Sequence, residues 1–221
     1  PTRTTTGLFH FALLVPSRLD LARTLRHFID SDVAISGASD HAVSEALYLT
    51  DPDGHGIEIY RDRPRSEWQY PNGQLKLVTE PFDAQGVLGE LGSRPSPWAG
   101  LPAGTVMGHV HLHVAHMPAA EQFYLDMLGF ELMARYGRTA SFIAAGGYHH
   151  HLGLNTWAGV GAPPAPPDTA RLLWYQIILP DTATLQATVA HLQAANISIT
   201  QTDSGYRLHD PAQNTILLTS N

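Results

Sequence analysis

The sequence predicts an α+β protein built from a repeated arrangement of one strand, one amphipathic helix and several short strands. Three stretches of the chain share this order, and we call them the first, second and third repeats. Each opens with an apolar run and continues with apolar residues at helical spacing. A repeat of about 50 residues cannot bury its own sheet, so we expect the repeats to pair.

The first repeat occupies residues 1–62. Ser17 follows its opening strand and is a suitable N-cap for a helix that continues to Ile29. The stretch Asp51-Pro52-Asp53-Gly54 is a strong turn signal between two further strands. The expected strands cover residues 8–15, 33–35, 45–50 and 56–60. Gly37, Gly54 and Gly56 are expected in turns.

The other two repeats cover residues 105–160 and 168–221, and together they form the expected second domain, 105–221. Residues 63–104 are expected to be a linker, as is the proline-rich stretch 161–167. The longer linker contains Trp68, Tyr70 and Trp98, so we expect it to pack over a surface. Because one repeat cannot bury its own sheet, residues 1–62 are expected to form half of a separate domain.

Composition excludes several classes of protein. The chain has no cysteine, which rules out disulfides, zinc–thiolate sites and cysteine nucleophiles. Its net charge of −7 and scattered basic residues argue against nucleic-acid binding. No apolar run is long enough to span a bilayer, so a cytoplasmic protein is expected. The 13 histidines make a metal site with nitrogen and oxygen ligands worth seeking.

His10 and Glu58 are the candidate metal ligands. His10 lies in the opening strand of the first repeat, and Glu58 lies in its last strand, between Ile57 and Ile59. Alternation places Glu58 on the face opposite the two isoleucines, where a buried carboxylate needs a partner such as a metal ion. The alternatives are a histidine satisfied within the core and a glutamate on a solvated face.

Several motifs resemble the vicinal oxygen chelate superfamily, which includes glyoxalases, bleomycin-resistance proteins and extradiol dioxygenases. They are Gly7-Leu8-Phe9-His10-Phe11-Ala12, Asp51-Pro52-Asp53-Gly54-x-Gly56-Ile57-Glu58-Ile59-Tyr60, Gly108-His109-Val110-x-Leu112-x-Val114, Phe123-Tyr124-x-x-x-Leu128-Gly129-Phe130 and Gly146-Gly147-Tyr148-His149-His150-His151. The combination resembles the two-domain catechol 2,3-dioxygenase type. The resemblance implies βαβββ modules that pair into cupped mixed β-sheets.

That family has four modules, whereas this chain has three repeats. The first repeat resembles the second module of the family, so the first module, with one ligand histidine, is expected to be absent. The chain also starts at Pro1 with no methionine, which suggests a piece of something longer.

The resemblance implies a ring-cleaving dioxygenase that acts on a catechol-like diol with O2. The most expected metal is Fe(II), with Mn(II), Zn(II) or Ni(II) as alternatives. Two histidines and one carboxylate would hold it. His10 and Glu58 would be ligands, His41 the acid/base and Tyr48 the residue that orients the substrate. Without the resemblance, His41 is a loop histidine and Tyr48 a core aromatic.

The source of the second histidine ligand stays open among three possibilities. It could come from an absent N-terminal module or from His10 of a second copy. It could also come from His109, which aligns with His10 because each lies five residues before a valine. Whether this chain alone is a dioxygenase depends on that source.

The second and third repeats are expected to form a metal-free half with a structural or interface role. Trp174 falls where His10 would lie in the third repeat, and Leu217 falls where Glu58 would lie. The run His149-His150-His151 is expected in a strand, where consecutive side chains point to opposite faces, so these are expected to be strand residues rather than three ligands of one ion.

Two other functions remain as alternatives. One is another metal enzyme of the superfamily, such as a glyoxalase with Ni or Zn or a hydroquinone dioxygenase, although no second glutamate matches a glyoxalase site. The other is a metal-free module that binds small molecules, as bleomycin-resistance proteins do. The expected partners are an aromatic diol and O2, with a homo-oligomer or pairing with the absent module, and a role in aromatic catabolism.

Overall fold

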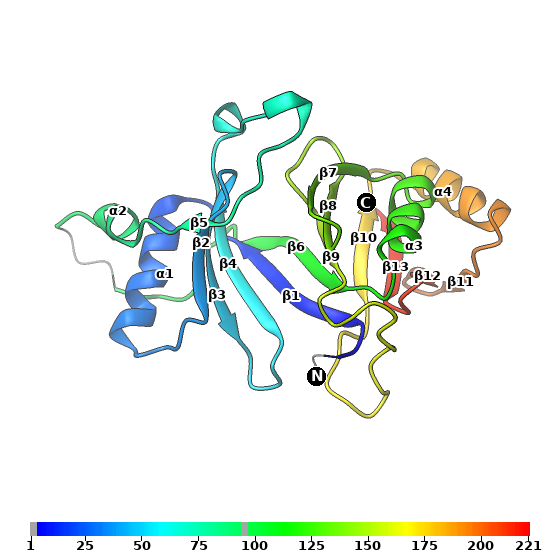
Figure 1. The fold of residues 1–221 in the computed structure, drawn as a ribbon, viewed down its shortest axis with the longest axis horizontal. Helices are drawn as coiled ribbons and strands as arrows, with labels where there is room; N and C mark the ends of the chain where they lie inside the picture. Colours follow the sequence, from blue (N-terminus) through cyan, green and yellow to red (C-terminus); the bar gives the residue numbers. More distant parts are fainter. Residues whose placement is uncertain (1–3, 94–96) are drawn as a thin grey trace. The chain divides into compact units, whose positions relative to one another are not determined.

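The computed structural model describes residues 4–93 and 97–221, which form two compact bodies (Figure 1). The N-terminal body runs from Phe9 to Val110. The C-terminal body contains residues 4–8 and 111–221. The strands β1 (Gly7–Leu14) and β6 (Val106–His113) each contribute residues to both bodies.

The described strands of the N-terminal body follow the order β5-β2-β3-β4-β1-β6. Besides β1 and β6, they are β2 (Gly37–Asp40), β3 (Ser44–Thr50), β4 (Gly56–Asp62) and β5 (Glu80–Pro81). Strand β4 runs parallel to β1 and antiparallel to β3. The first strand of the first repeat therefore lies between its last strand and the first strand of the second repeat.

Helix α1 (Arg18–Asp30) covers one face of this sheet (Figure 1). The side chain of Ser17 accepts a hydrogen bond from the backbone N–H of Asp20, which confirms the predicted N-cap. The buried cluster under the helix consists of Val15, Leu21, Ala22, Leu25, Phe28, Leu47, Ile59 and Val87. Burial of this apolar face fixes which side chains of the strands point away from α1.

The opposite face of the sheet holds a smaller group of side chains. Ala12, Ala46 and Tyr60 are fully buried there, and Leu14 and Tyr48 pack against them. Strand pairing sets Glu58 opposite both Ala12 and Tyr48, so Glu58 belongs to this second face. The apolar alternation that packs the sheet on α1 thus also places Glu58 and Tyr48 together on the opposite face.

Residues 63–104 contain short elements of their own. They are η1 (Arg65–Glu67), η2 (Pro71–Gly73), β5 and α2 (Ala84–Gly89). Strand β5 pairs with β2, and α2 packs against α1. Trp68 is buried, and the ring of Trp98 stacks on His27 with centroids 4.4 Å apart. The segment packs over the body, as its aromatic residues indicated.

Two local expectations for the first repeat were wrong. The short strand lies at Gly37–Asp40 rather than at residues 33–35, because its backbone pairs with β3 and with β5. Gly37 and Gly56 therefore lie in strands rather than in turns. Gly54 does lie in the predicted turn, with a φ of 88°.

The second repeat forms part of the C-terminal body. The end of β6 is followed by α3 (Met117–Glu121), the π-helical turn η3 (Gln122–Met127), β7 (Glu131–Tyr136), β8 (Ala140–Ala144) and β9 (Leu152–Asn155). His149, His150 and His151 precede β9, so their predicted strand was wrong. Ring nitrogens of His149 and His150 lie 2.7 Å apart in a bend of the chain.

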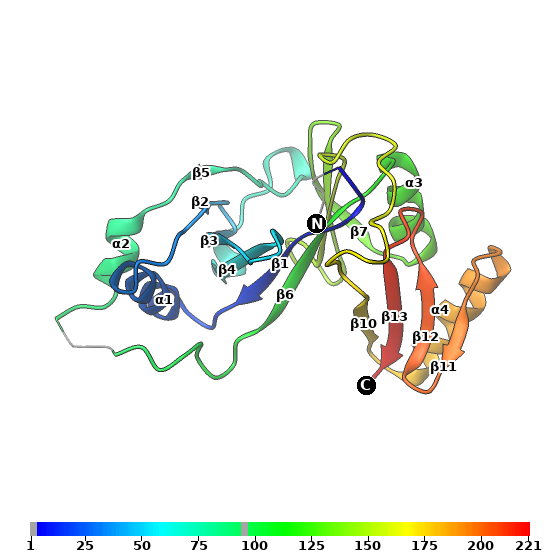
Figure 2. The same ribbon diagram turned by 90° about the horizontal axis from the view of Figure 1, so that it is seen from below.

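The third repeat forms a four-stranded sheet in the order β10-β13-β12-β11 (Figure 2). Its elements are β10 (Tyr175–Leu179), α4 (Thr182–Ala194), β11 (Thr200–Thr202), β12 (Gly205–His209) and β13 (Thr215–Ser220). Helix α4 packs against β10 and β13. Buried hydrogen bonds join this repeat to the second. The hydroxyl of Tyr124 donates to the carboxylate of Asp210 and also hydrogen-bonds the hydroxyl of Tyr175.

In the residues that the structure describes, no helix is long and apolar enough to cross a membrane.

Candidate metal centre

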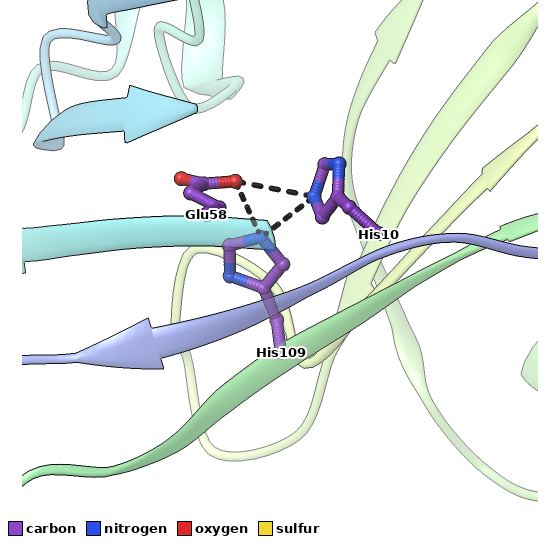
Figure 3. Close-up of side chains that lie close together, drawn as sticks. All are labelled: His10, Glu58 and His109. Atoms are coloured by element: carbon purple, nitrogen blue, oxygen red, sulfur yellow. Dashed lines mark hydrogen bonds and ion pairs between the residues drawn. The ribbon is translucent and has the colours of Figure 1, made fainter. Parts of the chain in front are cut away.

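Three neighbouring strands bring three metal-ligating side chains to one point (Figure 3). His10 comes from β1, Glu58 from β4 and His109 from β6. Nε2 of each histidine lies 3.1 Å from Oε2 of Glu58, and the two Nε2 atoms are 3.3 Å apart. The side chains are 2–9% exposed, so the group is closed to bulk water.

No assignment of protons satisfies all three of these contacts. The ionised Glu58 oxygen is an acceptor only, so a histidine facing it must carry hydrogen on Nε2. If both histidines do so, two N–H groups oppose each other at 3.3 Å. If one does not, its lone pair faces the carboxylate at 3.1 Å. A cation at the centre would satisfy all three atoms at once.

The spacing of the three atoms also fits a divalent metal. Ligand bonds of about 2.1 Å at right angles set neighbouring donor atoms roughly 3.0 Å apart, close to the observed separations. Two imidazoles and a carboxylate suit Fe, Mn, Zn or Ni. His10, Glu58 and His109 are the group of metal-ligating residues found within the described part of the chain.

Electrostatics keep Glu58 ionised despite its burial. Burial by itself would raise the pKa of the carboxyl, because a charge in an apolar surrounding is costly. The charges and hydrogen bonds of His109 and His10 outweigh this effect and hold the pKa of Glu58 well below its usual range. The site thus keeps an ionised carboxylate, which is a suitable anionic donor for a metal ion.

Glycine at position 56 allows the close approach of β4 to His10. A Cβ atom there would lie 2.7 Å from the Cβ of His10 and 2.9 Å from the carbonyl oxygen of Phe9. Gly108 has a similar role beside Tyr60, whose hydroxyl occupies the space that a side chain would need. Tyr60 in turn packs on His109, with ring centroids 5.0 Å apart.

His41 and Tyr48, the other two predicted site residues, lie together. Their contact joins Nε2 of His41 to the Tyr48 hydroxyl at 2.7 Å. Nδ1 of His41 lies 2.6 Å from the carbonyl oxygen of Val78, and because a carbonyl only accepts, Nδ1 carries the hydrogen. Neutral His41 therefore presents a bare Nε2 that accepts from Tyr48.

Tyr48 connects this pair to the group of three. Its ring centroid lies 6.0 Å from that of His10, and its partner across the strands is Glu58. Burial raises the pKa of Tyr48 well above its usual range, and the Glu58 carboxylate adds to this effect. The hydroxyl consequently keeps its proton at neutral pH and can donate a hydrogen bond.

The sequence left His109 as one of three sources for the remaining ligand, and the structure brings it to His10 and Glu58 within the N-terminal body. Sequence reasoning missed the contribution of Val78, because a backbone carbonyl leaves no mark in the residue pattern. It also missed Tyr60, although the alternation Glu58-Ile59-Tyr60 places that residue on the face of Glu58.

Repeated βαβββ modules in mixed, curled sheets with a histidine–glutamate group are typical of the vicinal oxygen chelate fold. The family model of the glyoxalase/bleomycin resistance protein/dioxygenase superfamily matches residues 106–216. Catechol-2,3-dioxygenase of Bacillus subtilis (strain 168) is 46% identical over 213 residues, which are 96% of this chain and 74% of that protein. The chain therefore belongs to the glyoxalase/bleomycin resistance protein/dioxygenase superfamily.

A solved structure shares the fold. It is a provisionally assigned dioxygenase from Bacillus subtilis subsp. subtilis str. 168, which aligns with a TM-score of 0.60 at 10% identity. The alignment covers 97% of this chain and 62% of that one, so this chain spans less than two thirds of its length. At this level of identity the likeness concerns the fold alone.

Proposed function

We propose that the protein is an extradiol-type dioxygenase that opens the ring of a catechol-like diol with O2. The observation that carries the proposal is the convergence of His10, Glu58 and His109 beside the hydrogen-bonded pair of His41 and Tyr48. The 46% identity to a catechol-2,3-dioxygenase supports the same reaction class. Both atoms of O2 would enter the product as the ring bond next to the diol breaks.

The three ligands suit Fe(II), with Mn(II) as the nearest alternative. Such an ion would supply the redox chemistry by which an aromatic diol reacts with O2. His10 and His109 would hold it as neutral nitrogen donors and Glu58 as the anionic donor. A divalent ion together with the single carboxylate of Glu58 would give the site a net charge of +1. This positive charge would favour binding of an anionic diol.

His41 would handle the proton of the diol. Its Nδ1–H is fixed on the carbonyl of Val78, which leaves Nε2 to accept a proton from a substrate hydroxyl. Imidazole is suited to this step because its ordinary pKa lies near neutrality. After ring opening, the same nitrogen can return the proton to the product.

Tyr48 would orient the substrate. Because its pKa is raised, the hydroxyl remains a hydrogen-bond donor and can exchange its partner His41 for an oxygen of the diol. The displaced Nε2 of His41 would then face the same substrate. The diol would thus bind beside the contact between these two residues.

The test is anaerobic loading of the full chain with Fe(II), followed by catechol and air. We expect O2 uptake equal to catechol consumed and a ring-opened aldehyde product in the mass spectrum. Glu58→Gln should lose both metal and activity, while His191→Ala, an exposed histidine on α4, should retain both.

Two outcomes separate the alternatives. Hemithioacetal isomerisation without O2 uptake would indicate a glyoxalase-like enzyme instead. A chain that binds no divalent metal with useful affinity would indicate a metal-free binding module, and the dioxygenase proposal would then fail.

A further inference from the structure

The third repeat contains a cleft at the positions that correspond to the metal centre of the first repeat. In the first repeat, Glu58 pairs with Ala12 on one side and with Tyr48 on the other. In the third, Leu217 pairs with Gln176 on one side and with Arg207 on the other. The two sheets therefore have matching registers, and Leu217 takes the place of Glu58.

The correspondence extends to the opening strand. Trp174 comes two residues before Gln176, as His10 comes two residues before Ala12. The four positions of the first-repeat site, His10, Ala12, Tyr48 and Glu58, are thus occupied by Trp174, Gln176, Arg207 and Leu217. No metal ligand is left, but an indole, an amide, a guanidinium and an aliphatic side chain now share the same face.

These residues line a cleft that is partly open to solvent. It has a volume of about 240 Å³ and is bounded by Trp174, Gln176, Ser204, Arg207 and Leu217, all within the C-terminal body. Binding sites for drug-sized ligands usually measure about 300–1,000 Å³, so this one suits a molecule of a single ring. Helix α4 packs against β10 and β13, and Ile216 and Leu218, which alternate with Leu217 along β13, are buried.

The charge and exposure of the lining residues indicate the kind of ligand. Arg207 is exposed and makes no ion pair among the residues that the structure describes, so its five donors are available. The Trp174 side chain is 48% exposed, which leaves a ring face open for stacking. Leu217 supplies apolar surface, while the amide of Gln176 is held by Thr219.

We propose that this cleft binds a planar aromatic carboxylate of one ring. The carboxylate would pair with the guanidinium of Arg207, whose planar fork matches its two oxygens. The ring would lie against Trp174 and Leu217. This site is separate from the metal centre, and it would hold a ligand of different chemistry on a related scaffold.

Benzoate is the probe for the test, used on the full chain in the presence of a chelator and in the Glu58→Gln background, which removes binding at the metal centre. Calorimetry should give one site per chain with a dissociation constant of about 0.1–1 mM. Quenching of tryptophan fluorescence should saturate over the same range and disappear in Trp174→Leu.

Arg207→Gln should weaken benzoate binding about tenfold or more, because it removes a charge-assisted hydrogen bond. The matched control is Arg171→Gln, which removes an exposed arginine of the same body and should bind as the wild type does. Benzamide, a neutral analogue of the same shape, should bind the wild type and Arg207→Gln equally weakly. Circular dichroism of each variant checks that it folds.

Three results would overturn the proposal. They are an absence of saturable benzoate binding, equal binding by Arg207→Gln and the wild type, or benzoate binding no tighter than benzamide. Sedimentation provides a further check, since Ile178 lies exposed on the same face of β10. If the wild type is a dimer and Ile178→Asp a monomer, a second copy covers this face, and that result would overturn the proposal as well.

Discussion

Nε2 of His109 lies 3.3 Å from Nε2 of His10, although 99 positions separate the two residues in the chain. Strand β6 lies beside β1 and makes this contact possible. The second histidine of the candidate metal group therefore comes from the opening strand of the second repeat. Glu58 completes the group from β4.

His109→Ala should reduce the affinity for Fe(II) or Mn(II) by at least about 100-fold, because it removes a direct ligand rather than a supporting contact. Metal content after gel filtration measures this effect. A chain that keeps one equivalent of metal after the substitution would show that the second histidine comes from elsewhere.

A mixture of His10→Ala and His109→Ala chains should bind no metal if one chain holds the whole group. A site built from two copies behaves differently, since one variant could then supply the histidine that the other lacks. Recovery of metal binding in the mixture would thus contradict the single-chain arrangement.

His41→Ala should leave metal binding intact and lower kcat by about 10²–10⁴-fold, the usual contribution of a general acid or base. Tyr48→Phe should also retain the metal but lose about tenfold to 100-fold in kcat/KM, because it removes one hydrogen bond. The loss of kcat/KM in the double variant should be smaller than the product of the two single losses, since the side chains contact each other. Fully multiplicative losses would argue that the two act independently.

Gly56→Ala should destabilise the N-terminal body by about 1–3 kcal/mol and weaken metal binding, since the new methyl group would push β4 away from His10. Gly89→Ala is the control, because a Cβ there meets nothing within 4 Å. Denaturant unfolding measures the stability of both variants. Equal stability of the two variants would mean that β4 and β1 are less closely packed than the structure has them.

Glu45→Gln should destabilise the chain by about 3 kcal/mol at neutral pH, because Glu45 is fully buried against Arg18 and Arg61. Burial tends to raise the pKa of Glu45, but the hydrogen bonds and charges of the two arginines outweigh it and lower that pKa.

A lowered pKa in the folded state means that the ionised carboxylate stabilises the fold above the unfolded pKa of about 4.3. This stability is lost as the pH falls through the lower, folded value. The difference in unfolding free energy between wild type and Glu45→Gln should therefore shrink as the solution is acidified below about pH 4. A difference that stays constant down to acid unfolding would contradict the assignment.

The apolar pattern was sufficient to predict the helix after Ser17, the strand that carries Glu58 and the face on which Glu58 lies. Alternation also set Tyr48 on that face, and the resemblance to the superfamily supplied the roles of His10, His41 and Tyr48. Local propensity misplaced β2, because Val33 and Ile35 favour a strand while the actual strand at residues 37–40 is selected by pairing with β3.

The sequence by itself indicated which residues could bind a metal and on which face of its strand Glu58 points, because side-chain alternation is a local property of the backbone. The neighbour of each strand was decided only in the tertiary structure. Placing β6 beside β1 depends on hydrogen bonds between segments about 100 residues apart, and no local pattern encodes that choice. His109, the carbonyl of Val78 and the cleft at Arg207 all follow from such pairings.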